Sequence, residues 1–302
     1  MTRTIRQHFV PRAYLRNFAS TSPNSGVERA WTLITRNARI VEVPLHSVAS
    51  RALFYDLGPD DHEQVLEKYF SQEVEGDLAA LLREVVAHFR LGNELDPKHK
   101  RRLAEHMAMQ YLRTSTFREA LRGNLERLGE VLGRLAHHVV EGAPPDLQLV
   151  PNVEARTHLL LGLTDDLIAT IAEILYRHAW RISQAPEGRS FMTNDAPVML
   201  LGQPLAPWMG VGFTTYDAQV LFPISPEFLL HTTDFISFHE KGHEGENAVL
   251  AVPPELVDHY NFIIAGMASE QAIGRTRAEV ESALERLRAE AAKLHVQFPK
   301  EG

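Results

Sequence analysis

Three ionisable residues stand beside apolar neighbours, where an unpaired polar group is costly to bury. His8 precedes the apolar pair Phe9–Val10, Glu73 falls on the apolar stripe of an expected helix, and Asp195 follows an apolar run at the end of an expected strand. Histidine and carboxylate side chains serve as general acids and bases, and together they bind divalent metal ions. We therefore predict His8 as a general acid or base, and Asp195 and Glu73 as catalytic bases or metal ligands.

Polar residues also interrupt the apolar stripe of the long helix expected in the middle of the chain. Gln110 and Arg113 are the members of this group that could bind a ligand, and Gln7 adds a third polar group next to His8. A guanidinium can act as an electrostatic clamp on negative charge. We predict that Arg113, Gln110 and Gln7 bind an anionic substrate, and that Arg113 faces the interior and meets a carboxylate.

A shared wet cleft would satisfy several such groups at a lower cost in free energy than separate burials. We therefore expect His8, Glu73, Arg113 and Asp195 to line one cleft. Each residue also has a structural alternative. Arg113 and Glu73 could form a buried pair between helices, Asp195 could cap its own backbone in a turn, and His8 could be a satisfied core histidine.

The segment His239–His243 reads His-Glu-Lys-Gly-His and fits the H-E-x-x-H zinc pattern. That pattern works because helical spacing places both imidazoles on one face, with the glutamate near a metal-bound water. Gly242 lies inside the motif, and a helix loses about 1 kcal/mol per glycine relative to alanine. We interpret residues 237–247 as a solvated polar loop without zinc. A zinc-dependent hydrolase that uses His239 and His243 is the lesser alternative.

Composition and missing motifs exclude several classes of protein. The 302 residues include no cysteine, which excludes disulfides, thiolate nucleophiles and cysteine-ligated metals. The net charge of −8 argues against a surface that wraps nucleic acid, while a local basic cleft stays compatible with it. Motifs of the G-x-x-x-x-G-K-[ST], G-x-G-x-x-G and G-x-S-x-G types are missing. Because the chain has neither a long apolar run nor a secretory apolar core near its start, we expect no membrane partner and a cytoplasmic location.

The apolar periodicity changes along the chain and predicts a single α+β domain over residues 1–302, dominated by helices. A hairpin is expected from Glu28–Arg36 and Ala38–Val43, and a strand-rich region at about 189–252. The expected helices are central ones at 63–90, 97–140 and 152–183, within about 60–185, and C-terminal ones at 253–267 and 276–294, within about 253–295. We expect the long central helices to pack on a small mixed or antiparallel sheet that joins N-terminal strands with strands of the C-terminal half.

Several short motifs make the sequence similar to a known family. They are Gln7–Arg12 with Tyr14–Leu15 and Asn17–Phe18, Phe54–Tyr55, the helix with Glu67 and Glu73, Gln110 with Arg113–Thr114, Phe191–Pro197 and Phe222–Pro226. On these residues the chain resembles the bacterial family catalogued as domain of unknown function 4238, over about residues 5–270. The family more often has Ser-Asp-Asn-Pro where this chain has Asn194–Pro197, so an amide at position 196 is not essential here. The resemblance does not include residues 237–247, and the family name implies no activity.

We therefore predict a hydrolase that acts on a phosphodiester or another anionic substrate through a dispersed His/Asp/Glu/Arg site. A divalent metal ion bound by carboxylate and histidine would suit such a site as a cofactor, and the partner would be a small anionic substrate or a local segment of nucleic acid. The alternative is a non-catalytic module that binds a small ligand or another protein. Its Arg113 and Gln110 would hold an anion or organise a core.

Overall fold

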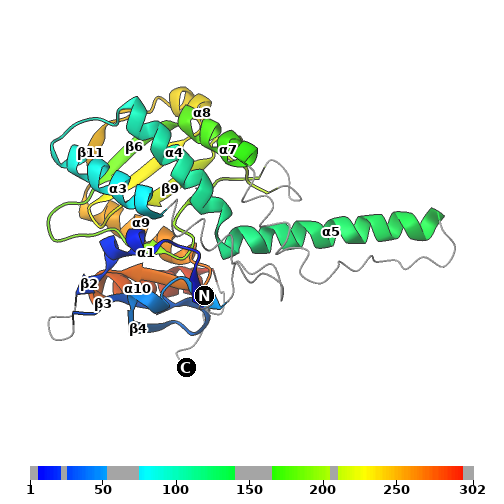
Figure 1. Cartoon of the computed structure of the whole chain (residues 1–302), viewed down its shortest axis with the longest axis horizontal. Coiled ribbons are helices and arrows are strands. Elements are labelled where there is room, and N and C mark those ends of the chain that lie inside the picture. The colour runs from blue at the N-terminus through cyan, green and yellow to red at the C-terminus, as the bar shows by residue number, and fades with distance from the viewer. Residues whose placement is uncertain (1–5, 22–25, 53–74, 140–164, 205–209, 295–302) are drawn as a thin grey trace.

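The computed structural model describes residues 6–21, 26–52, 75–139, 165–204 and 210–294. These residues form two five-stranded sheets, a two-stranded ribbon and helices that cover them (Figure 1). The predicted α+β class is confirmed. The expectation of a single sheet is wrong, because a second sheet forms from the C-terminal half alone. None of the helices in the described ranges is long and apolar enough to cross a membrane.

The first sheet combines strands from both ends of the chain, as predicted. Its order is β2–β3–β12–β7, with β4 also paired to β3, and every pair is antiparallel. The strands are β2 (Ser20–Thr21), β3 (Glu28–Ile34), β4 (Arg39–Pro44), β7 (Thr193–Asn194) and β12 (Gln271–Gly274). The predicted hairpin is β3 and β4, and Ala38 closes its turn with a φ of 52°. Helices α9 (Pro254–Gly266) and α10 (Arg277–Lys293) pack against this sheet, and α10 begins with a capping box of Thr276 and Glu279.

The second sheet has the order β11–β6–β10–β9–β8, in which only the β11–β6 pair is parallel. The strands are β6 (Ala179–Gln184), β8 (Met199–Leu201), β9 (Gln219–Pro223), β10 (Phe228–Thr233) and β11 (Val249–Ala251). Successive side chains of β9 point to opposite faces of the sheet. Val220 and Phe222 pack in one hydrophobic cluster with helices α3 (Glu75–Arg90), α4 (Pro97–Leu112) and α7 (Asp165–Arg177). Leu221 packs in a second hydrophobic cluster with α9. The sheet is therefore covered by helices on both faces.

Two of the expected helices end earlier than predicted. Residues 179–183 were expected to continue a central helix, but they form β6, because the ladders to β10 and β11 satisfy their backbone. The helix expected over 97–140 is interrupted at Arg113 and Thr114, between α4 and α5 (Ser115–Val139). The Thr114 hydroxyl accepts a hydrogen bond from Phe117 N at 3.2 Å and donates one to Tyr111 O at 2.9 Å. This local capping starts a new helix, and α5 extends away from the rest of the molecule (Figure 1).

The N-terminal segment lies between the two sheets and is part of the core. Strand β1 (Arg6–His8) pairs antiparallel with β5 (Ser50–Ala52), and α1 (Arg12–Leu15) follows it. Phe9, Tyr14 and Phe18 are almost completely buried. The Tyr14 hydroxyl donates to the Pro223 carbonyl at 2.6 Å, which ties α1 to the second sheet. The backbone around His8 is therefore fixed by the core.

Candidate functional site

Strand β1 directs His8 and Gln7 to opposite faces of the two-stranded ribbon. Gln7 is fully buried, whereas Arg6 is exposed and His8 is half-buried. Because successive side chains of a strand alternate between faces, His8 shares its face with Arg6 and with Ser50, its partner across the ribbon. Gln7 points to the core, away from His8. A substrate bound at the His8 ring would therefore lie on the other face of the ribbon from the Gln7 side chain.

Two side chains of α4 and its C-terminal cap hold the backbone that carries His8. Gln110 Nε2 donates to the Phe9 carbonyl at 3.0 Å, and Arg113 Nη2 donates to the His8 carbonyl at 3.2 Å. Arg113 is 2% exposed, so its predicted interior position is confirmed. Both residues thus hold the backbone of the N-terminal segment, and their predicted binding of substrate stays a prediction. Glu73, the expected carboxylate partner of Arg113, lies outside the described residues.

Asp195 anchors the segment that enters β12. Its Oδ1 accepts a hydrogen bond from Ser269 N at 2.9 Å, and its Oδ2 accepts bonds from Glu270 N at 2.8 Å and Gln271 N at 3.2 Å. The residue has no exposed surface. Burial raises the pKa of Asp195 to about 6, although the three backbone N–H groups favour its charged form. The carboxylate therefore serves the backbone, as the structural alternative for this residue anticipated, although it caps a distant segment and not its own turn.

A path of hydrogen bonds connects Asp195 with the backbone next to His8. Gln271, which donates to Asp195, accepts a hydrogen bond from Ala49 N through its Oε1 at 2.7 Å. Ala49 O in turn accepts from Phe9 N at 3.2 Å. Residues that are distant in sequence are thus brought together, but through backbone contacts. The expectation that their side chains line one cleft is wrong for Asp195 and Arg113, which are closed off from solvent.

The His8 ring is neutral at physiological pH and lies in a positive environment. Burial, assisted by the nearby charges of Arg12 and Arg6, lowers the pKa of His8 to about 4, while hydrogen bonding to the backbone at His46 and Leu45 opposes this shift. Arg6 and Arg12 have no carboxylate partner among the described residues, and Arg12 Nε is buried without a hydrogen bond there. A partly buried guanidinium without a counter-charge favours an anionic ligand.

Arg6 and Arg12 are the functional candidates that the sequence analysis missed. They flank His8 in the sequence, in a segment that is rich in arginine although the chain has a net charge of −8. Their spacing could have identified them, since Arg6 and His8 are two residues apart in a strand and so share a face. The turn into α1 that brings Arg12 near the ring could not be read from the residue pattern.

The structure does not form the helix that the H-E-x-x-H pattern requires. A short helix, α8 (Phe235–Glu240), starts at Asp234, whose carboxylate accepts from Ser237 N, and ends before Gly242, which has a φ of +67°. His239 lies in the helix and His243 lies beyond it, so the two imidazoles do not share one helical turn. The expected loop over 237–247 is wrong for its first residues, because Asp234 is a cap that the sequence analysis did not recognise.

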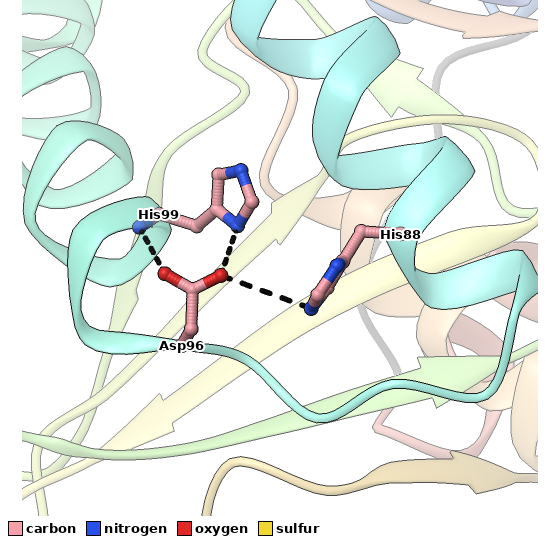
Figure 2. A group of neighbouring side chains, drawn as sticks. All are labelled: His88, Asp96 and His99. Carbon is pink, nitrogen blue, oxygen red and sulfur yellow. Dashed lines mark hydrogen bonds and ion pairs between the residues drawn. The ribbon is translucent and has the colours of Figure 1, made fainter.

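Among the described residues, a group that could hold a metal ion lies at a different place, between α3 and α4. It consists of His88, Asp96 and His99 (Figure 2). Asp96 is also the N-terminal cap of α4, since its Oδ1 accepts from His99 N at 2.9 Å. The two histidines were not considered, because His88 and His99 are joined only when the loop between the helices folds back.

The described elements define an α+β protein in which an N-terminal ribbon carries a neutral histidine flanked by arginines. Its chain belongs to the family described as protein of unknown function DUF4238, whose model matches residues 6–278. The matched range begins at Arg6, the first residue of β1, and includes Arg113 and Asp195. A search of curated proteins and a search of solved structures each gave no match.

Proposed function

We propose that the protein is a hydrolase that acts on a phosphodiester or another anionic substrate, with His8 as its general base and acid. The observation that carries this proposal is the neutral His8 ring beside Arg12, a partly buried arginine without a carboxylate partner in the described part of the chain. A neutral imidazole can take a proton from a water molecule, and guanidinium groups stabilise the charge of a phosphoryl group. The family resemblance points to a bacterial protein, and we keep the cytoplasmic location expected from the sequence as part of the proposal.

In this proposal the buried polar residues are positioning residues. Arg113 and Gln110 fix the carbonyl groups of residues 8 and 9, and Asp195 fixes the segment that supports Ala49. A site held this way keeps the His8 ring in one orientation relative to Arg12, which acid–base catalysis requires. Glu73 keeps its proposed role as a base or metal ligand.

A second candidate function is supported by the same contacts. Because Gln110, Arg113 and Asp195 all bind backbone groups, the site has few side chains left for chemistry. The alternative is therefore a non-catalytic module that binds a small anion between Arg6 and Arg12. Both candidates require an anion at Arg12, whereas only the hydrolase requires proton transfer by His8.

Arg12→Ala is expected to weaken the binding of inorganic phosphate and of bis(4-nitrophenyl) phosphate by at least about tenfold. The reason is the loss of a charge-assisted hydrogen bond, which contributes about 1.5–3 kcal/mol. Isothermal titration calorimetry on the whole chain measures the effect. Arg36→Ala is the matched control, since Arg36 is an exposed arginine in the turn between β3 and β4. Equal dissociation constants for wild type and Arg12→Ala would contradict the anion site.

A further inference from the structure

The group formed by His88, Asp96 and His99 brings two imidazoles to one carboxylate. His88 lies in the last turn of α3, Asp96 is the N-terminal cap of α4, and His99 lies in its first turn (Figure 2). One nitrogen or oxygen atom from each residue lies within 4.8 Å of the other two. Because Asp96 Oδ1 is engaged by the backbone of His99, both rings face the remaining oxygen, Oδ2.

The ring of His99 is buried without a satisfactory hydrogen bond. Its side chain is 8% exposed, and both ring nitrogens are buried with no well-aligned partner. Nδ1 lies 2.5 Å from Asp96 Oδ2, and Nε2 lies 3.1 Å from Glu84 Oε1. The ring therefore lies between two carboxylates, and neither contact has the full geometry of a hydrogen bond. A cation between Nδ1 and Asp96 Oδ2 would replace the first of these contacts with a metal–ligand bond on each side.

The separations of the candidate ligand atoms are close to those of a bound metal. Asp96 Oδ2 lies 2.5 Å from His99 Nδ1 and 3.8 Å from His88 Nε2. Ligands at about 2.0–2.2 Å from a tetrahedral zinc ion are roughly 3.3 Å apart, a value between these two distances. Small side-chain rotations would therefore place the three atoms around one ion and leave at least one position for water.

Each histidine of the group has a neighbouring side chain near the ring nitrogen that would not bind the metal. Metal-bound histidines almost always donate their other N–H to an oxygen. Glu84 is placed to accept from His99 Nε2, and the side-chain amide of Asn93 lies 3.5 Å from His88 Nδ1. With its oxygen turned toward the ring, this amide would accept from Nδ1–H. His88 Nε2 also lies 2.9 Å from the Glu94 carbonyl, a contact that a bound metal would replace or share.

The ion pairs of the neighbouring helix surfaces account for only part of this group, because Glu84 lies 3.1 Å from His99 Nε2 but forms no ion pair with His88. Arg102 binds Asp77 at 2.7 Å and Glu84 at 3.3 Å, and His106 Nε2 lies 2.9 Å from Asp77. These pairs each match a basic group with a carboxylate. At Asp96, by contrast, two rings whose centroids are 5.1 Å apart share one oxygen atom. A ligand that binds all three is the simplest arrangement that satisfies them.

We propose that His88, Asp96 and His99 form a binding site for a divalent transition metal ion, which ties the end of α3 to the start of α4. Two imidazoles and one carboxylate are a ligand set typical of zinc and of non-haem iron, whereas magnesium prefers oxygen ligands. The site lies at the opposite end of α4 from Arg113, roughly 20 Å along the helix axis at 1.5 Å per residue. It is therefore separate from the His8 site and independent of the proposed hydrolase activity.

The test is metal binding by the whole chain after treatment with a chelator. Calorimetry with Zn²⁺ is expected to give one tight site, and Mg²⁺ is expected to give none. Zinc in hundredfold excess over its dissociation constant should raise the melting temperature by about 4 °C. Co²⁺ bound at the same site should show the visible absorption of a low-coordinate complex. Iron(II) binding under anaerobic conditions, tighter than zinc binding, would identify iron as the ion at the same ligands.

His88→Ala and Asp96→Asn are expected to weaken zinc binding by at least about a hundredfold and to abolish the thermal shift. Asn caps a helix as well as Asp does, so the second variant keeps α4 intact while it removes the charge. His239→Ala is the matched control and should bind zinc like wild type. The proposal is overturned if wild type shows no saturable zinc binding, or if binding survives both substitutions, whether or not it is lost in His239→Ala. Circular dichroism of each variant confirms that the chain is folded.

Discussion

His8→Gln is expected to lower kcat for hydrolysis of bis(4-nitrophenyl) phosphate by about 10²- to 10⁴-fold, the range that general acid–base catalysis contributes. Glutamine has hydrogen-bonding groups but cannot exchange a proton. KM should change little, because Arg6 and Arg12 are left to bind the anion. The melting temperature should also change little, since the contacts of Arg113 and Gln110 are with backbone carbonyls that the substitution leaves in place. Release of 4-nitrophenolate and thermal melting measure the two effects.

The matched control is His46→Gln, because the side chain of His46 is exposed and only its backbone is hydrogen-bonded to the His8 ring. We expect wild-type turnover from this variant. Wild-type turnover from His8→Gln would show that His8 is not the acid–base group. A wild-type protein that binds phosphate at Arg12 but hydrolyses no phosphodiester would instead favour the non-catalytic module.

Asp195→Ala is expected to lower the free energy of unfolding by about 3–5 kcal/mol, with a fall in melting temperature on the order of 10 °C. Three backbone N–H groups, of Ser269, Glu270 and Gln271, would lose their acceptor inside the protein. Urea unfolding at neutral pH measures the loss. Asp258→Ala is the control, because its carboxylate forms a surface ion pair with Arg189 at 3.2 Å, and we expect it to lose less than about 1 kcal/mol.

The pH dependence of stability follows from the same carboxyl group. Burial raises the pKa of Asp195 to about 6 in the folded state, above its ordinary value of 3.8. The folded state then binds a proton more tightly than the unfolded state. Protonation of Asp195 therefore adds to the free energy of unfolding below about pH 4, and this contribution is lost as the pH rises through 6. Asp195→Ala should flatten this part of the stability curve. A variant that melts like wild type but has no activity would show that Asp195 takes part in the chemistry.

Much of the fold could be predicted because local signals agreed with the final structure. The hairpin of β3 and β4 and the helix expected over 276–294 were correct, since alternation and helix capping depend on neighbouring residues. The errors arose where a long-range partner decides the conformation. Residues 179–183 were expected to continue a helix, and it is their pairing with β10 and β11 that makes them a strand. The short helix after Asp234 and the break at Thr114 depend on single caps within otherwise helical or irregular stretches.

The sequence identified most residues of the candidate site, but it did not show which contacts their side chains make. His8, Gln110, Arg113 and Asp195 were singled out as polar groups with apolar neighbours, and hydrogen bonds do connect their positions. A sequence does not show whether the partner of a buried polar group is a ligand or a backbone amide, and here it is backbone for three of the four. The spacing of Arg6 and His8 could have identified Arg6, whereas the position of Arg12 near the His8 ring is visible only in three dimensions.

The most direct test of the His8 site is a titration of its ring by ¹⁵N NMR, with His8→Gln used to assign the signal. We predict a neutral imidazole at pH 7 with a pKa of about 4. Inorganic phosphate bound beside Arg12 should raise that pKa, because a nearby anion favours the charged imidazolium, and Arg12→Ala should remove the effect. A ring that titrates near the ordinary value of 6.5 and does not respond to phosphate would contradict both the neutral base and the anion site.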